Sequence, residues 1–265
     1  MNGLPLGWRV AANMATMAVL AFLVAPIVAV IPASFNKASF IRLPPQDWSP
    51  LWYGRFFGDG EWLRALLNSL EIAALATLIA VPVGTLAAMG LARAGARSRL
   101  VASGLFLAPM VVPVVVVAVA VYRSALDISM NGTLTALALS HAVLALPFVV
   151  INVGISLRGV NPSWLLAASG LGAGPWRIFR TVTLPNILPG VAGGAVFSFM
   201  TSFDEAVLTI FLADYSTKTL PVKLWETVRL EFTPVLAVAA TVMIALSVAL
   251  FVLVQLTARR NGDRT

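Results

Sequence analysis

Six long stretches of this 265-residue sequence contain no Asp, Glu, Lys or Arg. A helix needs roughly 20 consecutive, mostly apolar residues to cross a bilayer, and each of the six is longer than that. Backbone amide and carbonyl groups find no water in the apolar core, so such segments cross it as helices. The uncharged runs are residues 10–36, 72–92, 100–122, 128–157, 181–203 and 232–258. They predict an all-α, polytopic integral membrane protein with six transmembrane helices, the fifth extended by the apolar residues 206–213.

The composition also favours a membrane protein over a soluble one. Hydrophobic residues make up 59% of the chain and charged residues 11%, whereas soluble domains have roughly 45–50% and 25%. Cysteine is absent, which excludes disulfides and thiolate metal sites. The first apolar run is longer than the roughly 7 to 15 residues of a signal-peptide core and lacks a clear small-x-small cleavage site, so we predict that it stays as the first spanning helix.

The charged residues between the apolar runs predict the orientation. With a cytoplasmic N-terminus, ten basic residues and Asp263 lie on the cytoplasmic side, against eight basic and ten acidic residues on the other. The cytoplasmic basic residues are Arg9, Arg93, Arg97, Arg99, Arg158, Arg177, Arg180, Arg259, Arg260 and Arg264. Short cytoplasmic loops are enriched in Lys and Arg, so both chain ends are predicted to be cytoplasmic. Because these arginines lie at helix ends and form no single basic face, the formal charge of +7 does not indicate nucleic-acid binding.

Proline, glycine and arginine interrupt the segment 161–190, which lies between two apolar runs. Asn161 followed by Pro162 is typical of a helix start, because the Asn side chain accepts a free backbone N–H and proline fits the first helical position. Gly172 and Gly174 provide places for the helix to stop. Pro175 then begins a second helix, so the segment predicts a short helix, a glycine corner and another helix.

Both predicted helices are short. Trp164, Ala168 and Leu171 fall on one face of the first, and Pro185 and Pro189 are expected to disturb the second. Helices of this length are marginal alone in water, so they are expected to pack on the rest of the chain or on another protein.

The segment resembles the cytoplasmic coupling loop of permease subunits of binding-protein-dependent ABC importers. The pattern of that family is Glu-Ala-Ala, three residues, Gly, nine residues and Ile-x-Leu-Pro. The matching residues are Ala167, Ala168, Gly172, Val182, Leu184 and Pro185, with Val182 in place of isoleucine and Leu166 in place of glutamate. An interfacial hairpin without a partner would have a similar sequence, and this alternative stays open here.

The resemblance extends over about residues 68–256, in which SHAVLALPFVV, FSFMTSFDEAVLTIFL and TLPVKLWETVR are similar to spermidine/putrescine-type permease subunits. It implies one permease domain, 1–265, with residues 161–185 as a cytoplasmic coupling loop between the fourth and fifth spanning helices, in a bacterial inner membrane. It also implies a second homologous permease subunit, two ATPase copies and an external substrate-binding protein as partners. The residues expected to contact the ATPase are Trp164, Leu165, Leu166, Ala167, Ala168, Gly170, Leu171, Gly172, Ala173 and Pro175.

The chain itself offers no means of using ATP. Gly170, Gly172 and Gly174 are not followed by the Lys-Ser/Thr of a nucleotide-binding loop, so ATP and magnesium are expected on the partner ATPase, with no cofactor on this chain. The sequence has one histidine, His141, which is more typical of a packing residue than of a metal ligand. Without a catalytic set of side chains, we expect a subunit that is not an enzyme and holds no metal.

The transport path is expected near Asp204 and Glu205. In a helix that begins near Pro185 these acids lie roughly 29 Å along its length, toward the outer side. If the helix continues through Leu212, both acids lie in the apolar zone and face a cavity or partner. If it ends at Phe203, they cap its outer end.

A polyamine such as spermidine or putrescine would suit these two acids. Phe203 could add a cation–π contact, as could Trp225, which lies in an outer segment, 214–231, predicted to contain a short helix. Related permeases also carry ferric iron, opines, phosphonates and inorganic anions, so another small solute is an alternative. A self-sufficient channel or secondary transporter is a second, and a membrane enzyme a third.

Two further patterns concern the spanning helices. Pro109 and Pro113 are expected to bend the third helix. Gly190 and Gly194 have the spacing at which membrane helices approach closely, either within the chain or between subunits.

Overall fold

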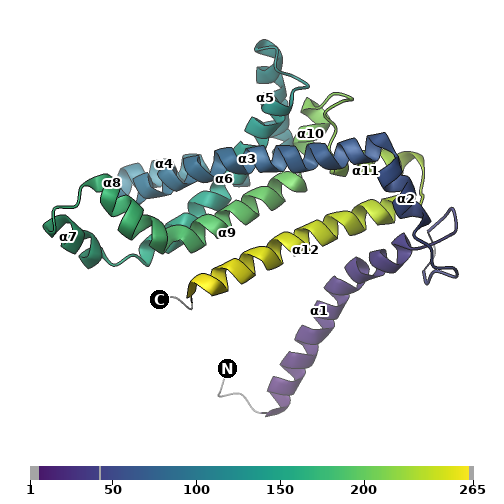
Figure 1. The fold of residues 1–265 in the computed structure, drawn as a ribbon, viewed down its shortest axis with the longest axis horizontal. Coiled ribbons are helices and arrows are strands. Elements are labelled where there is room, and N and C mark those ends of the chain that lie inside the picture. The colour runs from purple at the N-terminus through teal and green to yellow at the C-terminus, as the bar shows by residue number, and fades with distance from the viewer. Residues whose placement is uncertain (1–5, 42, 263–265) are drawn as a thin grey trace. The chain divides into compact units, whose positions relative to one another are not determined.

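A computed structural model describes residues 6–41 and 43–262, and almost all of their regular structure is helical. Figure 1 shows the helices in order along the chain. They are α1 (Leu6–Ser34), α2 (Leu51–Gly58), α3 (Gly60–Arg93), α4 (Ala96–Val111), α5 (Val114–Asp127), α6 (Leu134–Arg158), α7 (Pro162–Gly170), α8 (Pro175–Ile178), the π-helix η1 (Phe179–Thr183), α9 (Leu184–Phe203), α10 (Val207–Leu212), α11 (Leu220–Leu230) and α12 (Val235–Gly262). The all-α prediction is confirmed.

Among the described residues, five helices are long and apolar enough to cross a membrane. They are Gly7–Ser34, Gly60–Arg93, Leu134–Arg158, Pro175–Phe203 and Val235–Val254. The predicted third span is instead a pair, α4 and α5, bent by 100°. The count of six predicted spans therefore holds only if this bent pair serves as one span.

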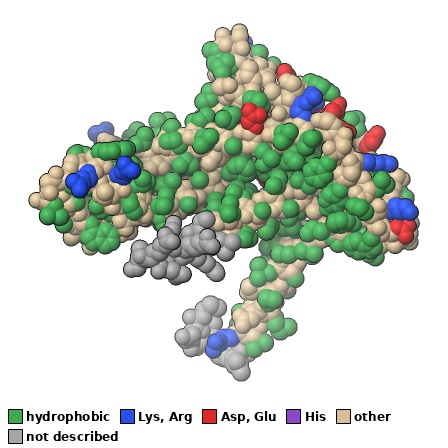
Figure 2. All heavy atoms as spheres, viewed as in Figure 1, with side chains coloured by type: hydrophobic (Ala, Val, Ile, Leu, Met, Phe, Trp, Pro, Cys, Tyr) green, Lys and Arg blue, Asp and Glu red, His purple; other side chains and the backbone are tan. Residues whose placement is uncertain are grey.

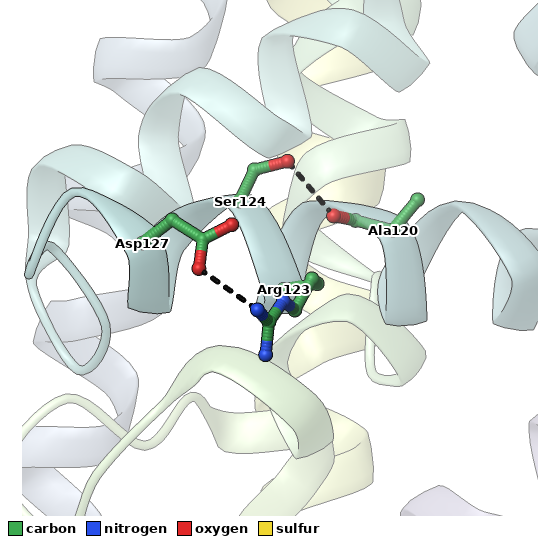
Figure 3. Close-up of polar contacts among 4 residues, drawn as sticks. All are labelled: Ala120, Arg123, Ser124 and Asp127. Carbon is green, nitrogen blue, oxygen red and sulfur yellow. Dashed lines mark hydrogen bonds and ion pairs between the residues drawn. The ribbon is translucent and has the colours of Figure 1, made fainter.

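The bend follows from Pro113. Steric contact with a proline ring pushes the preceding residue out of the helical region, and Val112 has φ −73° and ψ 131°. Pro109 lies inside α4 without ending it, so only one of the two prolines acts as predicted. Beyond the bend, α5 continues past the predicted end at residue 122. Its last turn carries an exposed ion pair, Arg123 Nη2 to Asp127 Oδ1 at 3.3 Å (Figure 3).

Contacts divide the chain into two compact units. Unit 1 comprises residues up to Leu63 together with Leu224–Leu246, and unit 2 comprises Arg64–Lys223 together with residues from Ser247 onward. Helices α3, α11 and α12 each have residues in both.

In unit 1, the segment after α1 is held by aromatic side chains. Trp52 Nε1 donates to the carbonyl of Ala38 at 3.1 Å, and the hydroxyls of Ser34 and Tyr53 are 2.8 Å apart. Phe56, fully buried, packs on Trp62 with ring centroids 5.6 Å apart. These contacts order the proline-rich stretch between α1 and α3.

In unit 2, α6 and α9 pack most closely, because the residues of α9 at their contact are glycines. A Cβ atom on Gly190 would lie 2.6 Å from the carbonyl oxygen of Asn152, and one on Gly194 would lie 3.0 Å from the Cα of Val149. Gly84 of α3 approaches the same residue, where a Cβ would lie 2.7 Å from the Cβ of Val149. The close approach predicted for Gly190 and Gly194 is confirmed, and it joins helices within this chain.

Candidate functional site

The helix α7 and its glycine corner have the geometry predicted from the sequence. Asn161 Oδ1 accepts the N–H of Ser163 at 2.9 Å, and Pro162 occupies the first turn. Gly172 has φ +78°, a region that side-chain-bearing residues rarely adopt. The helix, the corner and the new start at Pro175 are therefore confirmed.

Two backbone hydrogen bonds close the end of α7 in a Schellman motif. The N–H of Ala173 donates to the carbonyl of Ala168 at 3.1 Å, and that of Gly172 to Ser169 at 3.0 Å. This pattern requires a left-handed residue at the corner, which is the reason for glycine there. The corner is thus a defined turn rather than a loose loop.

The second helix is longer than the sequence suggested. Pro175–Phe203 continues as one apolar helix, and the predicted disturbance is confirmed before Pro185, where the register changes, but not at Pro189, which lies inside α9. The turn before Pro185 widens into the π-helix η1, in which the N–H of Leu184 donates to the carbonyl of Phe179, five residues back. A single π turn can occur inside a helix without ending it, and here it accommodates Pro185. The corner is therefore joined directly to a spanning helix.

Seven of the ten predicted coupling residues on α7 and the corner are exposed, and Leu165, Ala168 and Ala173 are half-buried. None of them is buried in the described structure. Leu171 is 88% exposed, Leu166 73% and Trp164 49%. Apolar side chains exposed on so short a helix gain little burial from the chain itself, which is typical of a surface that contacts another protein or a membrane. At this end of unit 2, Figure 2 shows basic side chains, and Arg177 and Arg180 lie on α8 and η1.

The residues predicted to line the transport path lie at a break between α9 and α10. Helix α9 ends at Phe203, so the prediction that 206–213 extends the fifth span is wrong, and of the two alternatives the second holds: the acids follow the end of the helix. Glu205 Oε1 accepts the N–H groups of Val207 and Leu208 at 2.7 and 3.0 Å and so caps α10. That cap is the physical reason why a new helix begins here.

The other path residues differ in their surroundings. Asp204 is exposed at the C-terminus of α9, and partial desolvation raises the pKa of its carboxyl group. Phe203 is 2% exposed and stacks on Phe199 with centroids 5.8 Å apart. Trp225 lies on α11, in unit 1, where the guanidinium of Arg229 lies 4.5 Å from its ring centroid. The structure thus brings together Phe203, Asp204 and Glu205, while Trp225 belongs to the other unit.

A buried polar contact at this break was only partly predictable. His141 is fully buried, with Nδ1 2.9 Å from Ser202 Oγ and Nε2 3.3 Å from Thr209 Oγ1. The prediction that His141 packs in the interior is confirmed. Its two partners lie on either side of the break, on α9 and α10, so this side chain of α6 ties both helix ends together.

A second polar contact missed by the sequence analysis holds the loop after α10. Asn68 of α3 donates through Nδ2 to the carbonyls of Ser216 and Lys218, both at 2.9 Å. Within the loop, hydrogen bonds from Ser216 and Thr217 lower the pKa of Asp214. Among the described residues there is no group of three or more His, Cys, Asp or Glu that could hold a metal ion.

Comparison with known proteins gives consistent matches over most of the chain. The family described as "Binding-protein-dependent transport system inner membrane component" matches residues 80–262. The spermidine/putrescine transport system permease protein PotC of Haemophilus influenzae is 34% identical over 244 residues, which cover 92% of this chain and 95% of that protein. The putrescine transport system permease protein PotI of Escherichia coli is 29% identical over 276 residues, covering 100% of this chain and 96% of that protein.

A solved structure shares the fold. A chain of the bacterial alginate ABC transporter in complex with an alginate pentasaccharide-bound periplasmic protein superposes with a TM-score of 0.73 at 17% sequence identity. The superposition covers 96% of this chain and 94% of that chain.

Proposed function

This chain belongs to the family of inner membrane components of binding-protein-dependent transport systems, and on that premise we propose how it takes part in import. It is a multi-pass, membrane-spanning permease subunit of an ATP-driven ABC importer. We propose that it imports a polyamine such as spermidine or putrescine. The observation that carries this proposal is the similarity to the spermidine/putrescine permease PotC over 92% of the chain.

The end of α9 offers a suitable environment for a cation. The C-terminal carbonyls of a helix carry a partial negative charge, and Asp204 and Glu205 follow directly after them. The Asp204 carboxylate accepts no hydrogen bond from the described residues, so its charge is available to an ammonium group. Glu205 already caps α10, which makes Asp204 the better candidate for contact with the substrate.

We propose that α7 and its corner dock on an ATPase in the cytoplasm. The exposed apolar residues of α7 supply the contact, and the closed corner joins it to the spanning helix Pro175–Phe203. A displacement of α7 by the ATPase would therefore reach Asp204, at the far end of that helix. In this arrangement ATP and magnesium bind to the ATPase, and this subunit carries out no catalysis.

The assembly contains, by this proposal, a second homologous permease, two ATPase copies and an external binding protein. Both ends of this chain lie in the cytoplasm, as the ten arginines on that side favour. The alginate transporter that shares the fold was solved with a periplasmic protein, which supports a binding-protein partner.

Proteoliposomes test the function directly. The assembled importer with its binding protein should take up radiolabelled spermidine only when ATP is supplied, and this subunit alone should move none. Uptake by the subunit alone would instead indicate a self-sufficient transporter. If the binding protein holds iron, a phosphonate or an inorganic anion and no polyamine, the proposed substrate is wrong but the assignment as an importer subunit stands.

Asp204→Asn tests the residue assignment. Because the neutral amide keeps the shape but loses the charge, we expect the KM for spermidine to rise about five-fold or more, the factor that corresponds to roughly 1 kcal/mol. Asp127→Asn, which removes an exposed acid in the same unit, is the control and should leave the KM unchanged. An unchanged KM in Asp204→Asn would show that this acid is structural.

A further inference from the structure

A pocket of about 510 Å³ lies between α3, α4 and α6, within unit 2. It is found at the ends of these helices that carry arginines, since Arg99 and Arg158 both line it. Apart from these two and Ser103, the lining residues are apolar or glycine. The pocket lies near the end of α6, far along that helix from His141 and the break after α9, and it reaches the first residue of α7, Pro162.

Arg99 is held in place at the pocket. Its Nε donates to the carbonyl of Leu91 at 2.9 Å, and its Nη2 to those of Ala92 and Ala94 at 3.3 and 2.9 Å. These bonds satisfy carbonyls at the end of α3, the negative end of the helix dipole. A guanidinium has five N–H donors, and the two on Nη1 make no hydrogen bond to the described residues. They remain for a ligand.

Arg158 brings a second positive charge. It lies in the last turn of α6 and is exposed, and no acidic residue lines the pocket. Neither arginine forms an ion pair within the described part of the chain. The charge of the pocket is therefore suited to an anion.

The apolar walls narrow the choice of anion. Leu107, Ile151 and Ile155 line the pocket on helices that cross or enter the apolar core. Helix α4 has no buried residues, so this wall is open to the surroundings of the subunit. A small soluble anion would use the arginines but leave the apolar walls without a partner. An acyl chain would cover them.

We propose that this pocket binds one anionic phospholipid of the cytoplasmic leaflet. Its phosphate lies between Arg99 and Arg158, and an acyl chain lies along Leu107 and Ile151. Basic pockets between membrane helices on the cytoplasmic side have the chemistry for such headgroups. The choice of leaflet rests on the orientation given under the proposed function.

The test is the lipid retained by the assembled importer, purified from vesicles of equal phosphatidylglycerol and phosphatidylethanolamine and measured by native mass spectrometry. The unmodified complex should retain phosphatidylglycerol in preference. Arg158→Gln should lower that retention about five-fold, as expected for one basic residue near the membrane surface. Arg97→Gln is the matched control, since it removes an exposed charge from the first turn of α4, two residues from Arg99 and outside the pocket.

A second pair of variants tests the pocket itself. Gly154 lines it, and an added Cβ would meet no atom within 4 Å, so Gly154→Leu fills the space without a backbone clash. It should abolish selective retention. Gly104→Leu is the control, because Gly104 is equally open and lies on α4 outside the pocket.

Several results would overturn the proposal. These are equal retention of both lipids, equal losses in Arg158→Gln and Arg97→Gln, and full retention in Gly154→Leu. Retention by the isolated subunit but not by the assembled importer would also overturn it, since a partner subunit would then cover the pocket. The readout does not depend on transport, so failure of ATP-driven uptake with intact lipid selectivity would count against the proposed function alone.

Discussion

The glycine corner between α7 and α8 provides the sharpest test of coupling. Gly172 has φ +78°, while a Cβ placed on it would meet no atom within 4 Å. A side chain at this position therefore clashes with nothing, and its whole cost is the left-handed backbone. For an L-residue that cost is roughly 1–2 kcal/mol, which lowers the population of the formed corner about 5- to 30-fold relative to its alternatives.

This cost predicts an order among substitutions. Asn tolerates the left-handed region best after glycine, whereas β-branched residues tolerate it least. We therefore expect spermidine uptake per ATP hydrolysed to fall in the order Gly172, Gly172→Asn, Gly172→Ala, Gly172→Val. The assay is the ratio of uptake to phosphate release in proteoliposomes that contain the assembled importer.

Gly174→Ala and Gly174→Val are the matched controls. Gly174 lies two residues away, is equally open, and has φ −69°, which any residue adopts. These variants should keep the ratio near its original value. The reasoning is refuted if Gly172→Asn couples no better than Gly172→Val, or if the Gly174 series loses coupling to the same extent.

Three further predictions concern stability. Gly190→Leu forces side-chain atoms against the backbone of Asn152 and should destabilise the purified subunit by about 1–3 kcal/mol or more. The melting temperature of this variant should therefore fall, whereas that of Gly104→Leu should not. Equal melting temperatures would contradict the α6–α9 contact. Asn68→Leu leaves two loop carbonyls without their donor, which costs roughly 1–3 kcal/mol of stability. Amide exchange in residues 214–220 should therefore accelerate, and unchanged exchange would contradict this role. The folded pKa of Asp214 lies below its unfolded value of about 3.9, so its contribution to stability is present above that pH and is lost as pH falls through the folded pKa. Exchange of the loop amides should accelerate with acid over that range in the unmodified protein but not in Asp214→Asn.

The signals that worked in the sequence were local ones. Uncharged runs identified the spanning segments because charge is excluded from lipid over any stretch of about 20 residues. Asn161-Pro162 and Gly172 predicted α7 and its corner because a cap and a left-handed turn depend on residues within one helical turn.

Other local patterns were misleading because each is compatible with two different backbone structures. Pro185 can end a helix or be accommodated by a π turn, and η1 provides the latter. The stretch from 204 to 206 could continue α9 or break it, and the Glu205 cap breaks it. Pro113 breaks a span where Pro109 does not.

The sequence by itself determined that this chain crosses a membrane as helices and has a glycine corner between two of them, since both follow from neighbouring residues. Only the tertiary structure decided which residues meet, because these contacts join positions 38 to 148 residues apart. They are Gly190 with Asn152, His141 with Ser202 and Thr209, and Asn68 with the carbonyl of Ser216. Such pairs have no local signal: each depends on where a whole helix is placed by its packing on others.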